Sequence, residues 1–234
     1  MGISEHPRSP TKLYLVRHGQ SVANVTWEFS YKRVDPPLTD LGVQQARITA
    51  EHLRSLPVDA LYASPMLRAV QTAEIFGAAL GLAYEIVEEL REVNVGELED
   101  RAPTREAWAI HTQIHHDWAS GKLDAAFPGG EDYHGLSGRA LRAFAQIVAA
   151  RPGRSSVVVA HGAIFTAAVD ALCPNVSMAE IVRLPNGNCG ITTVDVLTDG
   201  VTLTGTMPDG WSRRTHLEHL PQTRFPPPWT ASDS

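Results

Sequence analysis

The sequence predicts an α/β domain in which helices cover both faces of a mostly parallel β-sheet, and three observations point to this class. Leu13 to Val16 and Val157 to Ala160 are short, fully apolar runs, typical of strands buried on both faces of a parallel sheet. Strand patterns alternate with amphipathic helical patterns along most of the chain. The 234 residues contain no long linker, so we expect one three-layer α/β/α domain over residues 1–234.

The first half of the chain is expected to supply a regular alternation of elements. In order, these are strand 13–16, a helix at about 40–55, strand 58–64, helix 65–80 and strand 82–87. Thr39 is the candidate N-cap of the first helix. The second helix has the clearest boundaries, with Ser64 as N-cap, Pro65 at the first helical position and Gly81 as terminator.

The second half is less regular. We expect a helix at about 103–119, helix 136–150, strand 157–160, helix 162–172 and a terminal hairpin of strands 189–197 and 201–207. Residues 1–11 and about 208–234 are interpreted as tails. The segment at about 93–135 interrupts the alternation and is interpreted as an inserted cap that sets specificity.

Composition excludes several classes of function. The formal net charge of −6 gives no general attraction for nucleic acid or for an anionic membrane. No apolar run approaches the 18 residues of a transmembrane helix, so no membrane association is expected. Cys173 and Cys189 form neither a disulfide framework nor a metal spacing, which favours a cytoplasmic location. We expect no cofactor. The exposed strands near residues 190–207 could pair two copies in a homo-oligomer.

Two histidine-glycine pairs follow the two apolar strands. His18 precedes Gly19 after the first strand, and His161 precedes Gly162 after the second. In open α/β sheets, ligands bind beyond the carboxyl ends of the strands. If the two strands are neighbours, both histidines face one pocket, and each glycine lets the backbone approach a ligand closely.

Six motifs in order give the sequence a family resemblance. It resembles the histidine phosphatase superfamily, branch 1, whose fold is described as phosphoglycerate mutase-like. The motifs are RHGQSVAN at 17–24, PLTDLGVQQA at 37–46, SPMLRAVQTA at 64–73, EELREVNVGELED at 88–100, PGGED at 128–132 and VVVAHGA at 157–163. The ordered set is far more specific than the three letters RHG alone.

The resemblance implies a role for each site residue. His18 would be the nucleophile that forms a phosphohistidine, and it must be neutral, so a carbonyl is expected to hold one ring nitrogen. Glu92 would be the general acid and base. Phosphate would be bound by Arg17, Asn24, Arg68 and Gly162, and His161 would carry charge in the transition state.

The core motifs alone do not distinguish a phosphatase from a mutase. The expected function is hydrolysis of a small phosphorylated metabolite without a metal ion. A cofactor-dependent phosphoglycerate mutase is the alternative, but its paired arginines are absent after the acidic motif, and Arg213 and Arg214 lie elsewhere. A second alternative is a module that binds phosphorylated ligands without catalysis. Leu98 and Asp100 depart from the family's tryptophan and glycine, which leaves the pocket entrance undetermined.

Other residues have both a structural and a functional interpretation. His111, His115 and His116 are spaced along one helix, and a solvated helix face explains them better than a metal site. Glu131 is expected to hold its loop. The aromatic residues could line the substrate pocket or pack in the core or a lid, and we favour packing. They are Trp27, Phe29, Tyr31, Trp108 and Trp118.

Overall fold

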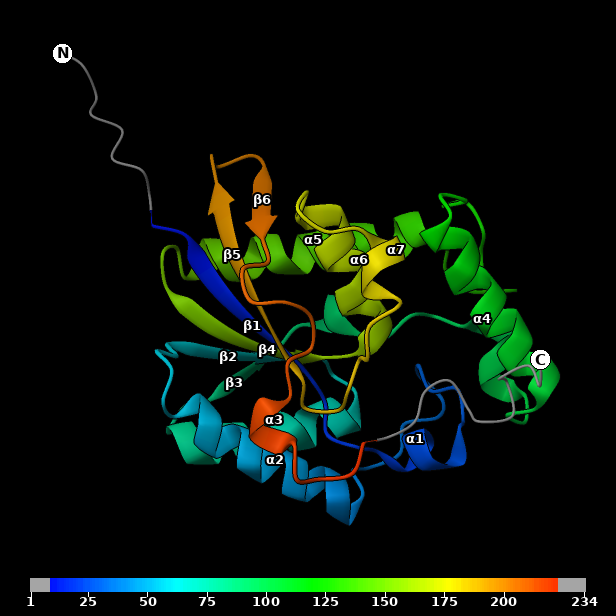
Figure 1. Ribbon diagram of the computed structural model, residues 1–234, viewed down its shortest axis with the longest axis horizontal. Helices are drawn as coiled ribbons and strands as arrows, with labels where there is room; N and C mark the ends of the chain where they lie inside the picture. Colours follow the sequence, from blue (N-terminus) through cyan, green and yellow to red (C-terminus); the bar gives the residue numbers. More distant parts are fainter. Residues whose placement is uncertain (1–8, 223–234) are drawn as a thin grey trace.

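The computed structural model describes residues 9–222 and contains one six-stranded sheet with the order β3-β2-β4-β1-β5-β6 (Figure 1). The first four strands in this order are parallel to one another, and β5 and β6 continue the sheet as an antiparallel hairpin. The strands are β1 (Thr11–Arg17), β2 (Ala60–Ala63), β3 (Tyr84–Ile86), β4 (Ser155–Ala160), β5 (Ile191–Thr198) and β6 (Leu203–Thr206). The predicted α/β class and mostly parallel sheet are confirmed.

Helices pack on both faces of this sheet. The α-helices are α1 (Val22–Thr26), α2 (Asp40–Leu53), α3 (Leu67–Leu80), α4 (Arg105–Ala119), α5 (Tyr133–Ala150), α6 (Gly162–Leu172) and α7 (Met178–Ile181). The 3₁₀-helices are η1 (Glu88–Leu90), η2 (Gly96–Asp100) and η3 (Thr215–Leu217). Helices α2 and α3 cover one face, α5 and α6 the other, and α4 lies beyond the end of the sheet with α1 (Figure 1). No helix of residues 9–222 is long and apolar enough to cross a membrane.

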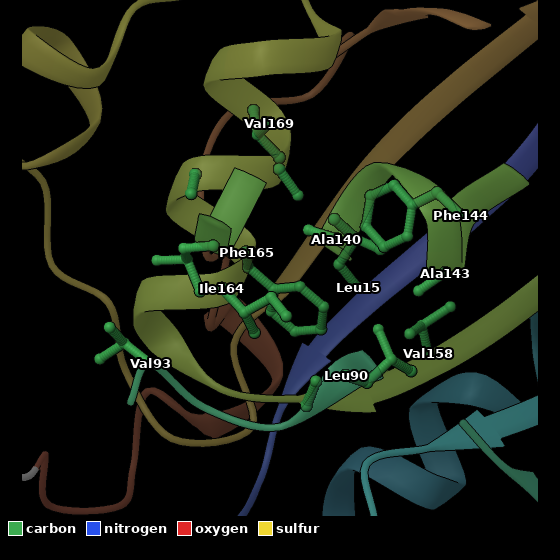
Figure 2. Close-up of a cluster of buried hydrophobic side chains, with 14 of the residues drawn as sticks. Leu15, Leu90, Val93, Ala140, Ala143, Phe144, Val158, Ile164, Phe165 and Val169 are labelled. Carbon is green, nitrogen blue, oxygen red and sulfur yellow. The ribbon is translucent and has the colours of Figure 1, made fainter. Parts of the chain in front are cut away.

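The sheet separates two hydrophobic clusters because successive strand side chains point to opposite faces. Leu13 and Leu15 of β1 pack toward α5 and α6, whereas Tyr14 and Val16 pack toward α2 and α3. Figure 2 shows part of the first cluster, where Phe144 of α5 and residues of α6 meet β1 and β4. Both faces of β1 and β4 are therefore buried, as the continuous apolar runs predict.

Helix α3 begins later than the sequence predicts. Its first helical residue is Leu67, and neither Ser64 nor Pro65 occupies the predicted capping position. Instead, the carboxylate of Asp35 accepts from the Leu67 N–H at 2.9 and 3.0 Å. A carboxylate from a distant loop thus satisfies the helix end, and Ser64 is free for another role.

Residues 208–222 do not form the expected tail. Arg213 forms a β-bridge with Ile191, and Trp211, Arg214 and Leu217 are buried against the domain. The fold therefore extends about fifteen residues further than the sequence indicates. The rest of the expected tails, residues 1–8 and 223–234, lies outside the described residues.

Candidate active site

The two histidines meet because their strands are neighbours. Strands β1 and β4 pair in parallel with Arg17 opposite Ala160, so both chains leave the sheet at the same edge. The rings of His18 and His161 are 5.2 Å apart, centre to centre, and are buried. The sequence left the adjacency of these strands open, and the structure establishes it.

His18 is fixed in one tautomer. Its Nδ1 lies 2.7 Å from the carbonyl oxygen of Gly19, which can only accept, so Nδ1 carries the proton. Its Nε2 accepts from Nε of Arg68 at 3.0 Å and therefore has its lone pair directed at the arginines. Burial and the charges of Arg68 and Arg17 hold the pKa of His18 well below 6.5. The ring is therefore neutral, and a carbonyl holds its Nδ1 as expected.

Two arginines, the buried Arg68 and the partly buried Arg17, line the cavity together with His18. Arg68 donates to the Ser30 hydroxyl at 2.6 Å and to the Ser30 carbonyl at 3.4 Å. Arg17 donates through Nη1 to the carbonyl of Asn186, while its buried Nε has no partner. Burial lowers the pKa of Arg68 to about 10, which still leaves it charged at neutral pH. Charged guanidinium groups with donors to spare form a binding site for phosphate.

Asn24 and Gly162 complete the rim of this site. The Oδ1 of Asn24 accepts from Ser21 N–H at 3.1 Å and from Asn188 Nδ2 at 3.0 Å, which leaves its amide nitrogen as the group to donate to a ligand. A Cβ on Gly162 would lie 3.0 Å from Asn186 Nδ2. Glycine is therefore needed here for the close approach of two loops beside Arg17.

His161 is buried beneath the site at the N-cap of α6. A hydrogen bond of 2.7 Å joins its Nε2 to Ser64 Oγ, and its Nδ1 has no partner among residues 9–222. Burial and the charges of Arg68, His18 and Arg17 hold its pKa well below 6.5. His161 is therefore neutral without a ligand, and the protonated form expected in the phosphate complex stays a prediction.

Glu92 is positioned by the first turn of α6. Its two carboxylate oxygens accept from the N–H groups of Ala163 at 3.2 Å and Ile164 at 3.1 Å, and Oε1 also accepts from Val93 N–H at 2.9 Å. The helix N-terminus is a favourable place for this negative charge. Glu92 lines the same cavity as His18, Arg17 and Arg68. The structure thus brings together every residue that the resemblance indicates.

Several supporting residues were not identified from the sequence. Ser64 contacts His161, Ser30 contacts Arg68, and Asn188 donates to the His18 carbonyl at 3.0 Å. One of them had a signal in the sequence, because Ser64 directly follows a strand and lies just before a site arginine. Ser30 lies in a loop without any such pattern.

Two acidic residues hold the loops that carry the site. Glu131 accepts from Asn94 N–H at 2.7 Å and binds Arg139 through both oxygens, so it holds its loop as expected. Glu99 is 7% exposed. One of its oxygens accepts from four successive N–H groups, those of residues 31–34. Burial alone would raise the pKa of Glu99, but these four donors lower it overall.

The site opens into a cavity of about 440 Å³, a volume typical of small-molecule sites. Trp27, Phe29 and Trp108 line it, whereas Trp118 is packed in the core. His111 and His115 also line it and contact aromatic rings, so the solvated helix face that we expected for them is wrong. Among residues 9–222, no three histidine, cysteine or acidic side chains are grouped so as to hold a metal ion.

Comparison with known proteins gives a consistent result. Residues 13–206 match the sequence profile of the histidine phosphatase superfamily (branch 1). A putative phosphoserine phosphatase 2 of Hydrogenobacter thermophilus is 31% identical over 195 residues, which cover 82% of this chain and 93% of that protein. A probable phosphoglycerate mutase GpmB of Yersinia pestis is 30% identical over 189 residues, or 79% and 84% of the two chains. The structure of a mycobacterial glucosyl-3-phosphoglycerate phosphatase superposes with a TM-score of 0.69 at 27% identity, over 87% of this chain and 100% of that chain.

Proposed function

Since the chain belongs to branch 1 of the histidine phosphatase superfamily, we propose that it hydrolyses small phosphomonoesters through a phosphohistidine intermediate. The observation that carries this proposal is the state of His18. A neutral ring with its proton fixed on Nδ1 and its Nε2 lone pair between two arginines has the form that a phosphoryl acceptor needs.

In the first step, His18 Nε2 attacks phosphorus, the N–P bond forms and the P–O bond to the alcohol breaks. Arg17 and Arg68 balance the charge of the phosphoryl oxygens, so this chemistry requires no metal ion. Glu92, which must enter this step with a proton on its carboxyl group, gives that proton to the departing alkoxide and becomes a carboxylate. In the second step, Glu92 takes a proton from water, which attacks the phosphohistidine and releases inorganic phosphate and the free ring.

His161 supports the transferring group from below. If the Ser64 hydroxyl, which accepts from Met66 N–H at 3.3 Å, donates to His161 Nε2, then the ring proton is on Nδ1. This Nδ1 has no protein partner and is the group that would donate to a phosphoryl oxygen. Bound phosphate would also raise the pKa of His161, because it offsets the arginine charges.

The experiment is to trap the intermediate. The protein is mixed with p-nitrophenyl phosphate, denatured in base within milliseconds to seconds, and digested for mass spectrometry, because phosphohistidine is stable in base. We expect phosphate on His18 alone and none in His18→Ala, which should also lose nearly all turnover. Glu92→Gln should slow turnover by about 10² to 10⁴. Phosphate on another residue, or full turnover by His18→Ala, contradicts the mechanism.

A mutase is the second candidate because one relative carries that name. The described cavity lining has no arginine besides Arg17 and Arg68 and no lysine to hold the carboxylate of a phosphoglycerate, which favours hydrolysis. A mutase would interconvert phosphoglycerate isomers, with a bisphosphate primer, faster than it releases phosphate.

If no substrate releases phosphate and no isomer forms, the protein is a binding module. A cytoplasmic location and a homo-oligomer stay predictions.

A further inference from the structure

The cavity extends well beyond the groups that would hold a phosphate. Beyond Arg17, Arg68 and Asn24, its wall is mostly apolar and aromatic. It is built from Trp27, Phe29, Trp108, Ile181, Leu184 and Trp211. These residues come from the loops around α1, from α4 and from the segments after α7 and β6, so four separate parts of the chain contribute apolar surface to one wall.

The rim of the cavity exposes large apolar side chains. Val182 is 46% exposed and Leu184 is 49% exposed, and both line the cavity just after α7. Single exposed apolar residues are common on protein surfaces. Here, two exposed apolar residues lie at the mouth of a cavity whose inner wall is also apolar. Together they form a continuous surface that a bound ligand would cover and remove from water.

The charges in this cavity disfavour an anionic leaving group. Arg17 and Arg68 are the only lysine or arginine side chains in the described lining; Arg68 donates to His18, and Arg17 donates to the Asn186 carbonyl. The other charged residues there are Glu28 and Glu92, which repel a carboxylate. A carboxylate on the substrate would lose water without gaining a cation, which costs free energy.

The two inner histidines behave as part of the apolar wall. The ring of His111 lies 4.8 Å from that of Trp108 and 4.5 Å from that of His115. Burial lowers the pKa of His115 to about 4. Burial and the neighbouring His115 hold the pKa of His111 well below 6.5. Both rings are therefore neutral at pH 7 and offer flat surfaces instead of positive charge.

We propose that this cavity selects phosphomonoesters with an uncharged apolar or aromatic leaving group, in preference to amino-acid or sugar-acid phosphates. The inference rests on the proposed phosphatase function and adds the substrate class. The phosphate would bind between Arg17 and Arg68, and the carbon skeleton would lie against Trp27, Trp108 and Leu184.

The first test compares kcat/KM for phosphate esters whose alcohols are similarly good leaving groups, so that intrinsic reactivity does not decide the result. We expect benzyl phosphate and hexyl phosphate to exceed O-phosphoserine and 3-phosphoglycerate by about tenfold or more. Calorimetry with benzylphosphonate and phosphonoacetate measures the same preference without turnover. The benzyl compound should bind at least several-fold more tightly.

Surface variants connect this preference to the cavity. Leu184→Asp replaces an apolar contact on the rim with a charged group, and it should reduce the ratio of kcat/KM for benzyl phosphate over methyl phosphate by about fivefold or more. Leu197→Asp is the matched control, because Leu197 is 52% exposed and does not line the cavity. It should retain the wild-type ratio.

The outcomes separate the inference from the proposed function. If phosphoserine or 3-phosphoglycerate is the better substrate, or phosphonoacetate the tighter ligand, the inference is wrong while hydrolysis stands. An unchanged ratio in Leu184→Asp also overturns it. If no substrate is hydrolysed and no phosphohistidine forms, the proposed function fails, and the phosphonate binding still decides whether the cavity prefers apolar ligands.

Discussion

At the residue scale, the Ser64 hydroxyl holds the ring of His161, for which we propose a catalytic role. Ser64 is fully buried at the end of β2 and is the hydrogen-bond partner of His161 Nε2. Without it, a ring nitrogen is left buried and unpaired, which costs about 1–3 kcal/mol, and the ring is free to rotate. Ser64 thus positions His161 and does not itself contact the phosphate.

We expect Ser64→Ala to lower kcat by about tenfold and to change KM much less, because the ring acts in the transition state. It should also lower thermal stability. Steady-state kinetics across pH 5 to 8 measures kcat and KM, together with the shift of the pH–rate profile that a changed His161 produces. Ser156→Ala is the control, since Ser156 is equally buried but its hydroxyl has no partner. Equal kinetics for the two variants would refute the positioning role.

The sequence predicts the groups that we propose to contact phosphate better than the groups that support them. His18, Arg17 and Arg68 stand in ordered motifs at strand and helix ends, where the chemistry requires particular residue types. Ser30 and Asn188 could not be found in this way, because a hydrogen bond to a site residue can come from any loop that folds nearby. Their positions depend on tertiary contacts over 38 and 170 residues of separation.

At the element scale, Arg139 of α5 fixes the segment that carries Glu92. Its guanidinium donates to the carbonyls of Glu89 at 2.7 Å, Arg91 at 2.5 Å and Glu92 at 2.7 Å, and it binds both oxygens of Glu131. The side chains of Arg139 and Glu131 are 11% and 17% exposed. One planar fork thus connects a helix, the acidic segment and the Gly-rich loop.

We expect Arg139→Met to destabilise the protein by about 3–5 kcal/mol, because it leaves a largely buried carboxylate without its cation and three carbonyls without a donor. Arg139→Lys, which keeps the charge but not the fork, should fold and show a lower kcat with a similar KM. Urea denaturation and kinetics measure these effects. Arg142→Met is the matched control, since Arg142 is on the same helix, is 65% exposed and pairs only with the Glu89 side chain. A loss in that variant equal to the loss in Arg139→Lys would contradict the assignment.

Helix η2 acts on the phosphate site through the loop at residues 30–35. Glu99 holds the four N–H groups of residues 31–34, and Asp100 pairs with Arg33 at 2.7 Å. In the same loop, Ser30 and Asp35 contact Arg68, and Asp35 also accepts from the first N–H of α3. The departures at Leu98 and Asp100 thus leave this connection intact, with Leu98 buried in the core.

We expect Glu99→Gln to weaken binding of inorganic phosphate several-fold and to destabilise the protein by about 1–2 kcal/mol. The amide keeps an acceptor oxygen but loses the charge that strengthens all four hydrogen bonds. The competitive inhibition constant of phosphate and the urea midpoint measure the two effects. Glu97→Gln is the control, because Glu97 is 61% exposed and pairs with a half-exposed Arg101. Unchanged phosphate binding in Glu99→Gln would show that the loop does not position Arg68.

Element boundaries were predicted well where local signals decide them and poorly where distant residues do. The helix at 162–172 has the predicted limits, since it follows a buried strand and a glycine. Helix α3 starts at Leu67 because Asp35, 32 residues earlier, supplies its cap. No window of local sequence around α3 contains that carboxylate.

At the scale of the whole molecule, the pattern of strands and helices determined the sheet, but not what surrounds it. Periodicity identifies β1 and β4 because both their faces are buried. It does not reveal that residues 208–222 pack against the domain, since that segment has no period. Nor does it place His111 and His115, which turn toward the cavity because aromatic partners from other segments gather there.

Two buried histidines and three partly buried ones link the stability of the molecule to pH. Burial lowers the pKa of His115 and His216 to about 4 and holds those of His18, His161 and His111 well below 6.5. In the unfolded chain these rings titrate near 6.5, so below that pH the unfolded state binds more protons than the folded state. Stability is therefore fully present above about pH 6.5 and decreases as the pH falls toward the folded-state pKa values.

We expect the urea midpoint in phosphate-free buffer to be nearly constant from pH 8 to 7 and to fall steeply from pH 6.5 to 4.5. Each neutral buried ring contributes up to about 1.4 kcal/mol per pH unit to that slope, because protons bind only to the unfolded chain. His115→Phe keeps an apolar ring in the cavity wall and should reduce the slope by nearly the contribution of one ring, about 1.4 kcal/mol per pH unit. Gln113→Phe, on the exposed face of α4, should leave the slope unchanged. Phosphate should flatten the slope further, because an anion between the arginines allows His161 to take up a proton in the folded state. A midpoint that stays constant or rises between pH 6.5 and 4.5 would show that the buried rings are charged in the folded protein.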